Sequence, residues 1–311
     1  MKRKIIIFVA FLLPMTMLGQ KLDVYGRKMV KSITMRGYYI NDDIVYEYDS
    51  KGLVTKITSD SKVPPCGTGS RIKATLTMAN GELRYVDEIG GGDKMHATYV
   101  VKGRRITLKS LTVGEATRYV HEYTYTSDGH IESMWENNRY LVTGRFCYDP
   151  GVWMYKFDFE GGVFNNYLAQ YYEYNDRRLS ETKVHGISDF DLGAVGKEQH
   201  HHSSVVFSDK KNDTNLCIES FMEVYPCSYS GFNGAEWTCD WMGMYSTNLP
   251  EYIKTPTKLV SGKNIVNINK VIMYDYDERG NLTGFSVSYD HDYSGYKAYE
   301  TTRRVEFKYV E

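Results

Sequence analysis

Three aromatic residues in one irregular segment are the strongest candidates for ligand contact in this sequence. Trp237 and Trp241 flank Cys239, and Tyr245 follows four residues after the second tryptophan. Indole and phenol rings offer a sugar a flat apolar face, and their polar atoms add directional hydrogen bonds. The segment lies outside the repeated strands described below, so Trp237, Trp241 and Tyr245 are predicted to contact a ligand such as a glycan. The tyrosines of the repeats have a simpler role, as cross-strand pairs that hold a sheet together.

Five cysteines occur, at positions 66, 147, 217, 227 and 239. Cys217, Cys227 and Cys239 lie in the same aromatic segment, so one disulfide among these three is predicted for an exported chain. Buried, reduced thiols are the alternative. The odd total leaves at least one cysteine without an intramolecular partner. The gaps between these cysteines do not match the Cys-x-x-Cys spacing that zinc sites favour, so no metal site is predicted.

Two polar clusters could bind a metal ion or perform chemistry. His200, His201 and His202 are consecutive, and neighbouring residues of a strand point to opposite faces, so three adjacent histidines rarely hold one ion. A solvated loop is the preferred interpretation of this cluster. The run Asp290-His291-Asp292 places an imidazole between two carboxylates, which could orient and charge it. A loop after the last repeat is again preferred over a hydrolase site.

Catalytic and cofactor signatures do not occur in the sequence. The run from Asp275 resembles a calcium loop only superficially, because Arg279 and Ser286 stand where ligands are needed. No Gly-x-Ser-x-Gly, His-Glu-x-x-His, phosphate-cradling or dinucleotide-binding pattern is present. We therefore predict no catalytic residue, no cofactor and no enzyme. The carboxylate pairs of glycosidases have no local signature, so a polysaccharide hydrolase stays the weakest alternative.

The elements that position these residues are repeated hairpins. Four segments share Tyr-x-Tyr, a polar turn and a return strand, and they begin at Tyr46, Tyr123, Tyr172 and Tyr274. Alternating tyrosines place both rings on one face of a strand. An Asp or Asn side chain caps the turn, and a glycine supplies the positive φ in all but the third segment. Further hairpins are predicted at Asn80-Gly81, the strongest two-residue turn signal, and at Lys102-Gly103.

Composition agrees with this pattern. The chain has 311 residues, of which 28 are Tyr and 14% are aromatic, with seven Pro. These values favour strands and exclude a helical bundle, a coiled coil and a collagen-like chain. Unequal spacing of the repeats excludes a propeller or solenoid. We predict an all-β fold, an antiparallel meander forming a large sheet, a sandwich or a barrel-like sheet. It would be a single β-rich domain over residues 21–311, with two β halves meeting near 145–165 as an alternative.

The hairpins resemble the tyrosine-aspartate (Rhs-type) repeats of bacterial surface proteins. The whole chain is more closely similar to an uncharacterised family of secreted proteins from gut Gram-negative bacteria with a porin-like β fold. The Tyr-x-Tyr-Asp-x-x-Gly-x-Leu segments carry this resemblance, together with residues 246–253, which match the family's Ser-x-Asn-Leu-Pro-x-x-Ile element. The resemblance implies a fold and an exported location. Because the family has no known activity, it implies no site residues.

Residues 1–20 have the pattern of a secretory signal peptide. Lys2-Arg3-Lys4 precede an apolar run from Ile5 to Leu13, which is too short for a transmembrane helix. Gln20 follows Gly19, so no cysteine is available there for acylation and no lipid anchor is predicted. Removal of these residues would leave 35 basic residues (38 − 3) against 39 acidic ones, a net charge of −4. With no basic stripe, nucleic acid is not an expected partner.

These observations predict a compartment and a fold more firmly than a function. The first hypothesis is an exported protein of the periplasm, cell surface or exterior that acts as a binding or structural module for a glycan or an envelope protein. The alternative is an outer-membrane β-barrel, which alternating strands and abundant aromatics favour. Against the barrel, several strands are shorter than the 9–11 residues of a full span.

Overall fold

The structure is a computed structural model of the 311-residue chain. It describes residues 20–37, 40–61, 72–89, 95–113, 117–142, 145–148, 151–175, 178–185, 201–222, 234–261, 264–292 and 297–311.

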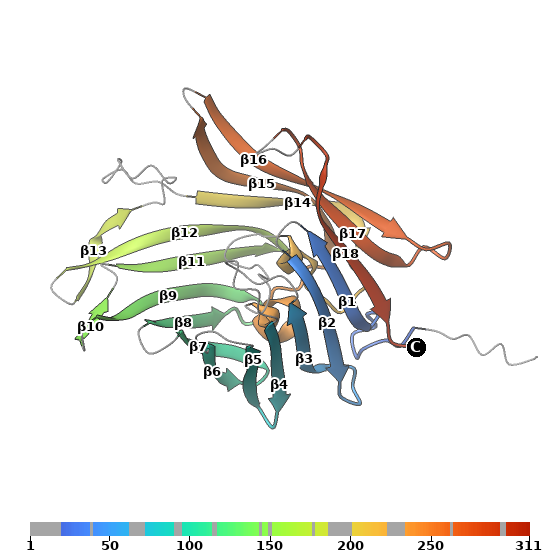
Figure 1. Cartoon of the computed structure of the whole chain (residues 1–311), viewed down its shortest axis with the longest axis horizontal. Coiled ribbons are helices and arrows are strands. Elements are labelled where there is room, and N and C mark those ends of the chain that lie inside the picture. The colour runs from blue at the N-terminus through green and yellow to red at the C-terminus, as the bar shows by residue number, and fades with distance from the viewer. Residues whose placement is uncertain are drawn as a thin grey trace, which may run out of the picture.

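In these described ranges, eighteen antiparallel strands make up one sheet (Figure 1). The first nine are β1 (Val30–Gly37), β2 (Ile40–Tyr48), β3 (Val54–Ser61), β4 (Ile72–Ala79), β5 (Glu82–Ile89), β6 (Met95–Lys102), β7 (Arg105–Val113), β8 (Thr117–Tyr125) and β9 (Ile131–Val142). The others are β10 (Arg145–Tyr148), β11 (Gly151–Glu160), β12 (Val163–Asn175), β13 (Arg178–His185), β14 (His201–Lys211), β15 (Asn248–Ser261), β16 (Asn264–Tyr276), β17 (Leu282–Tyr289) and β18 (Thr301–Tyr309). The predicted all-β antiparallel fold is confirmed.

The strands close into a barrel. Each strand from β1 to β9 pairs with the next, and β9 continues through β11, β12 and β14 to β18. The ring closes where β18 pairs with β1, with Phe307 opposite Ile33 and Val305 opposite Met35. Of the eighteen strands, β10 and β13 extend the far ends of β9 and β12, which leaves sixteen in the ring. Of the three sheet shapes allowed by the sequence, the barrel is the one formed.

The predicted turns join these strands. Gly52, Gly129 and Gly280 have φ values of 75°, 89° and 78°, the left-handed conformation that glycine adopts without a steric penalty. At two of the turns an aspartate caps the backbone: Asp49 Oδ1 accepts hydrogen bonds from the amides of residues 51 and 53, and Asp277 Oδ1 accepts those of residues 279 and 281. This confirms the prediction that both segments form hairpin turns. The turn of the third repeat includes residues 176 and 177, outside the described residues.

The inner face of the barrel is apolar. Ile33, Met35, Ile44 and Ile57 alternate along β1 to β3 with outward neighbours that are mostly polar, and each of the four is at most 1% exposed. Burying such side chains removes apolar surface from water, which is the main force that stabilises a folded domain. The ring is too wide for its own side chains to fill, so another part of the chain must supply the rest of the core.

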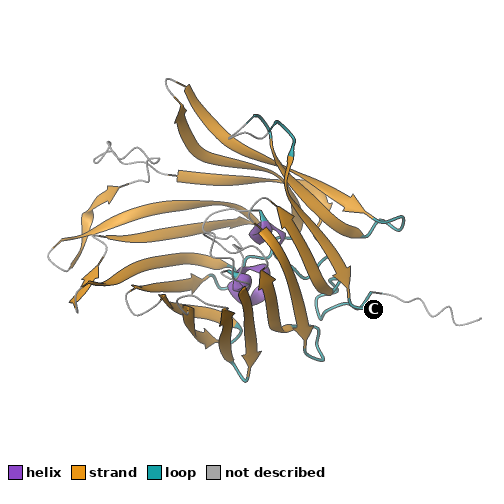
Figure 2. Cartoon of the chain, viewed as in Figure 1, coloured by secondary structure: helices purple, strands orange, loops and turns teal. Residues whose placement is uncertain are grey.

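That part is the segment of residues 212–247, which we call the plug. Its described portions carry three short 3₁₀ helices, η2 (Ile218–Phe221), η3 (Ala235–Thr238) and η4 (Asp240–Met242). Figure 2 shows these helices gathered inside the ring of strands. Apolar plug residues share one buried cluster with the barrel wall, among them Phe221, Trp241 and Met242. No described helix is long and apolar enough to cross a membrane.

The outer face carries polar side chains in rows that cross the strands. One row, in register over five strands, contains Glu306, Thr34, Asp43, Asp60 and Lys73. Another, over β2 to β5, contains Glu47, Lys56, Thr77 and Arg84. Opposite charges meet along this face, at 2.9 Å between Arg36 and Asp43 and at 2.6 Å between Lys56 and Glu47. Over β18 and β1 to β5 the outer face is therefore largely polar and charged, whereas the inner face is mostly apolar.

Candidate functional site

One end of the barrel, which we call the mouth, is crossed by residues 20–29, which we call the strap. The Lys21 amide donates a hydrogen bond to the Val310 carbonyl at 2.9 Å, next to the last strand. The Lys28 amide donates to the Asp213 carbonyl at 2.6 Å, and the Asn215 amide donates back to Lys28 at 3.0 Å. The Lys28 ammonium also pairs with the Asp213 carboxylate at 2.5 Å. The strap therefore joins the last strand to the plug across the mouth.

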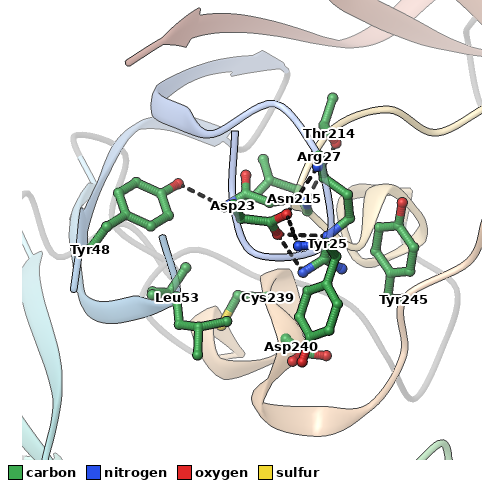
Figure 3. Close-up of polar contacts among 12 residues, drawn as sticks. Asp23, Tyr25, Arg27, Tyr48, Leu53, Thr214, Asn215, Cys239, Asp240 and Tyr245 are labelled. Carbon is green, nitrogen blue, oxygen red and sulfur yellow. Dashed lines mark hydrogen bonds and ion pairs between the residues drawn. The ribbon is translucent and has the colours of Figure 1, made fainter. Parts of the chain in front are cut away.

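Arg27 is the centre of the strap (Figure 3). Its guanidinium carbon lies 4.7 Å from the ring centre of Tyr25 and 4.5 Å from that of Tyr245. One aromatic ring of the strap and one of the plug therefore stack on the same cation. Asp23 accepts a hydrogen bond from Arg27 Nε at 2.7 Å and from the amides of Tyr25 and Arg27 at 2.9 Å each. The loop can turn this tightly because Gly26 has a φ of 77°. The pattern Asp-x-Tyr-Gly-Arg is a local turn signal, but this turn was not among those predicted from the sequence.

Cationic side chains of the barrel wall hold the plug in place. Lys109 of β7 forms an ion pair with Glu236 of η3. Arg303 of β18 donates a hydrogen bond to the Phe221 carbonyl at 2.7 Å, and Lys270 of β16 donates to the Met222 carbonyl at 3.3 Å. These two carbonyls lie at the carboxyl end of η2, where backbone acceptors have no partner within the helix. The wall thus contacts the plug through directional bonds in addition to apolar packing.

The three residues predicted to contact a ligand all lie on the plug. Trp237 is 4% exposed and Trp241 is 0% exposed, because the barrel surrounds the segment that carries them. The Trp237 ring packs edge-to-face on Tyr123 of β8, with ring centres 5.9 Å apart. The expectation that these two indoles form a surface for sugar stacking is therefore corrected: both are core residues. Tyr245 is only partly buried, but its ring stacks on Arg27 and its hydroxyl donates to the Asn212 carbonyl at 2.6 Å.

The cysteine prediction is also corrected. Cys217 and Cys239 are buried free thiols. Any disulfide among Cys217, Cys227 and Cys239 would use at least one of these two, so the predicted bridge is not formed. Burial raises the pKa of both thiols well above the ordinary value, and the nearby carboxyl of Glu219 adds to the effect at Cys217. The alternative of buried, reduced cysteines holds for this pair.

Of the two polar clusters considered in the sequence, one lies in a strand and the other in a loop. His201 and His202 belong to β14 and pair with β12, so they lie in a strand and not in a loop, whereas His200 lies outside the described residues. The loop expected after Tyr289 is present. In it, Asp290 accepts hydrogen bonds from Tyr252 and His291, and from Asn269 at 3.0 Å. Partial burial alone would raise the pKa of Asp290, but these hydrogen bonds lower it overall. Among the described residues, no group of three potential metal ligands comes together.

A cleft of about 1740 Å³ opens beside the strap at the mouth. Leu22, Tyr48 and Tyr309 contribute apolar surface, and charged residues surround them. Four basic and four acidic side chains line the cleft, so their charges balance and select neither an anion nor a cation. The hydroxyls of both tyrosines donate to backbone carbonyls, Tyr48 to Val30 and Tyr309 to Leu282, which fixes their rings in the wall. Its lining suits an uncharged ligand better than an ionic one.

Together these features define a closed β-barrel that is filled by its own chain and covered at one end by a strap. Solved structures with this fold exist. A porin-like protein from Bacteroides uniformis is 15% identical, with a TM-score of 0.53 over 91% of this chain and 99% of that one. A porin-like protein from Bacteroides vulgatus is 14% identical, with a TM-score of 0.45 over 90% of this chain and 98% of that one.

The likeness to the Bacteroides uniformis protein bears out the expected porin-like β fold, at the level of the fold alone. No family model matches the sequence, and no curated protein matches it. The likeness to tyrosine-aspartate repeats stays a prediction.

Proposed function

We propose that the chain is an exported cell-envelope protein whose barrel faces water on the outside and works as a binding or structural module, not as a pore. The observation that carries this proposal is the charged outer wall. Glu306, Asp43, Asp60 and Lys73 lie in a single row, and the next rows are also polar. A membrane-spanning barrel needs the opposite arrangement, an apolar outer band about 25 Å tall around a polar interior.

The free-energy cost of placing such an outer wall in lipid would add up over its charged side chains. A Lys or Arg on the lipid-facing side of a barrel costs about 2–4 kcal/mol near the bilayer midplane, and acidic residues cost less. The rows that contain Asp43, Asp60 and Lys73, and Glu47 and Lys56, would place such groups in lipid, whereas in water their ion pairs are ordinary surface contacts. The interior argues in the same direction, because the plug occupies the space that an aqueous channel would need.

A second candidate is an outer-membrane barrel, and two observations favour it. The ring has sixteen strands, a number found among porins. The similar protein from Bacteroides uniformis is described as porin-like. In this case the plug would be a gate and the charged rows would lie outside the hydrocarbon. Export, which both candidates share, is supported by the signal-peptide pattern of residues 1–20. Neither candidate is an enzyme, and a glycan or an envelope protein is the proposed partner of the first.

Fractionation of the native protein tests the choice. Envelope membranes are washed with alkaline carbonate, and the retained material is run with and without boiling. The first candidate predicts release by carbonate and no increase in the permeability of liposomes to small solutes. Retention after washing, together with anomalous migration of the unboiled band, would favour the membrane barrel. A known porin and a known periplasmic protein from the same cells serve as controls for each step.

A further inference from the structure

A second, much smaller cavity lies under the strap, where four parts of the chain meet. Its volume is about 10 Å³, which is room for one particle of the size of a water molecule. The strap, the β2–β3 turn, the β6–β7 turn and the plug all line it. Figure 3 shows Asp23 of the strap, Leu53 of the first turn and Asp240 of the plug close together at this place.

Two N–H groups of residues that line this cavity have no hydrogen-bond partner among the described residues. They are the indole Nε1–H of Trp241, which is 0% exposed, and the Nε–H of Arg104 in the β6–β7 turn. Another nitrogen of Arg104, Nη2, donates to the Val54 carbonyl at 2.9 Å and fixes the side chain beside the cavity. A buried donor without an acceptor loses the hydrogen bond that it makes to water in the unfolded chain, so such groups are rare in folded proteins.

The acceptor side chains that line the cavity are engaged elsewhere. Both oxygens of Asp23 accept hydrogen bonds from the strap, Oδ1 from two amides and Oδ2 from Arg27 Nε at 2.7 Å. Asn215 Oδ1 accepts a backbone amide of β1 at 3.0 Å. Asp240 Oδ1 faces Arg105 at 3.5 Å. The described chain therefore does not supply the acceptor that the two N–H groups lack.

The charged groups around the cavity leave one cation over. Arg27 pairs with Asp23 at 2.6 Å, and Arg105 pairs with Asp240 at 3.5 Å. Arg104 forms no ion pair with any described residue, and its one hydrogen bond is to a backbone carbonyl. Three guanidinium groups therefore meet two carboxylates here, an excess of one positive charge. A guanidinium whose Nε is shielded from water is stabilised by an anion beside it.

We propose that this cavity binds one small hydrogen-bond acceptor, which accepts from Arg104 Nε and Trp241 Nε1 and joins the wall to the plug beneath the strap. Chloride fits this chemistry best, because it accepts several hydrogen bonds, donates none and supplies the missing negative charge. It is only slightly larger than a water molecule. Water would supply the same two hydrogen bonds without the charge, and the experiment distinguishes the two. The site is independent of whether the barrel faces water or lipid.

A crystal structure of the protein grown in sodium bromide tests the proposal directly, because bromide takes the place of chloride and scatters X-rays anomalously. We expect a density peak within hydrogen-bond distance of both Arg104 Nε and Trp241 Nε1. An anomalous signal at that peak identifies a halide, and a peak without one identifies water. A structure with no peak bonded to both nitrogens would overturn the proposal.

Chloride titration tests the same site in solution. Urea unfolding is followed at constant ionic strength while sodium gluconate, whose anion is too large for the cavity, is replaced by sodium chloride. A bound halide raises the folding equilibrium constant by up to about tenfold for each tenfold rise in chloride. Arg104→Met removes the Nε donor and its charge, and Arg279→Met is the matched control, because it removes an exposed cation of the β16–β17 turn. Trp241→Phe is matched by Trp237→Phe, a buried indole of the plug that does not line the cavity.

Each occupant gives a different combination of results. With chloride, the dependence on chloride disappears in Arg104→Met and Trp241→Phe and persists in both controls. Each variant is compared with itself over the titration, so a variant that is merely less stable still gives a valid result. With water, the crystal peak has no anomalous signal and no variant depends on chloride. A halide peak together with equal chloride dependence in Arg104→Met and Arg279→Met would show an adventitious ion only and would overturn the proposal.

Discussion

Lys109 of the barrel wall and Glu236 of the plug form an ion pair that is almost completely shielded from water. The Nζ and Oε1 atoms are 2.5 Å apart, and the side chains are 6% and 2% exposed. The two residues are 127 positions apart in the chain. Taking two charges out of water is costly, and their attraction offsets that cost only while both partners are present. Loss of either partner is therefore expected to weaken the attachment of the plug to the wall.

The first prediction concerns the loss of one partner. Lys109→Met leaves the Glu236 carboxylate buried without its cation, and we expect the free energy of unfolding to fall by about 3–5 kcal/mol in urea titrations. The double variant Lys109→Met/Glu236→Gln removes the uncompensated charge and should recover much of that loss. The control is Lys56→Met, which breaks a 2.6 Å pair with Glu47 on the outer wall, where the side chains are 35% and 57% exposed. It should cost less than about 1 kcal/mol. Equal losses at the two sites would contradict this account.

Local features of the fold could be predicted from the sequence, and closure of the ring could not. The turns at Gly52 and Gly280 are encoded by a few adjacent residues, so their pattern was sufficient. By contrast, the pairing of Ile33 with Phe307 joins the two ends of the domain, and the sequence of neither strand indicates with which other strand it pairs. The indoles were misplaced for a related reason. Whether Trp241 is exposed depends on the strands that surround the plug, and its neighbours in sequence carry no sign of them.

The second prediction concerns the pH dependence of stability. Glu219 on η2 is 1% exposed, and burial raises its pKa from 4.5 to about 7, with only partial opposition from the Ser246 hydroxyl and the backbone. The native chain therefore keeps a proton that the unfolded chain has released. Between about pH 4.5 and pH 7 the stability contributed by this group falls as pH rises, by about 3 kcal/mol in total. Glu219→Gln should be more stable than the unmodified protein at pH 8 and similar to it at pH 4.5.

The comparison must be made as a difference at each pH, because His121 acts in the opposite direction. Burial, with a smaller effect of Lys109, lowers the pKa of His121 to about 3, so its contribution to stability is lost as pH falls below about 6.5. Subtracting the curve of the unmodified protein removes that contribution. Glu306→Gln on the outer wall, where the side chain is 58% exposed, is the control and should give a nearly flat difference curve. A flat curve for Glu219→Gln as well would contradict the prediction.

The third prediction concerns the two buried thiols. In a variant whose other three cysteines are replaced by serine, Cys217 and Cys239 should resist a maleimide or a disulfide reagent in the folded state and react fully in urea. The reason is that both are enclosed by the barrel and both have raised pKa values, so little thiolate is present or accessible. Thiol counts with and without denaturant measure this directly. A peptide in which the two are joined by a disulfide, or rapid labelling of the native protein, would disprove it.

The fourth prediction concerns the contact between the plug and the β8–β9 turn. Gly243 has a φ of 64°, and a Cβ atom there would lie 2.4 Å from the Gly129 carbonyl oxygen. That oxygen belongs to the backbone, so it cannot shift without moving the turn. The Gly243 carbonyl also accepts a hydrogen bond from the Ile131 amide at 3.2 Å. Gly243→Ala should therefore lower the free energy of unfolding by more than about 2 kcal/mol, combining the left-handed conformation with a steric clash. Gly280→Ala is the matched control, since Gly280 has a φ of 78° and open space around the added atom. That variant should lose only about 1 kcal/mol, the conformational part alone.

Urea unfolding of both variants separates the two contributions, and similar losses would show that the plug does not press against the turn.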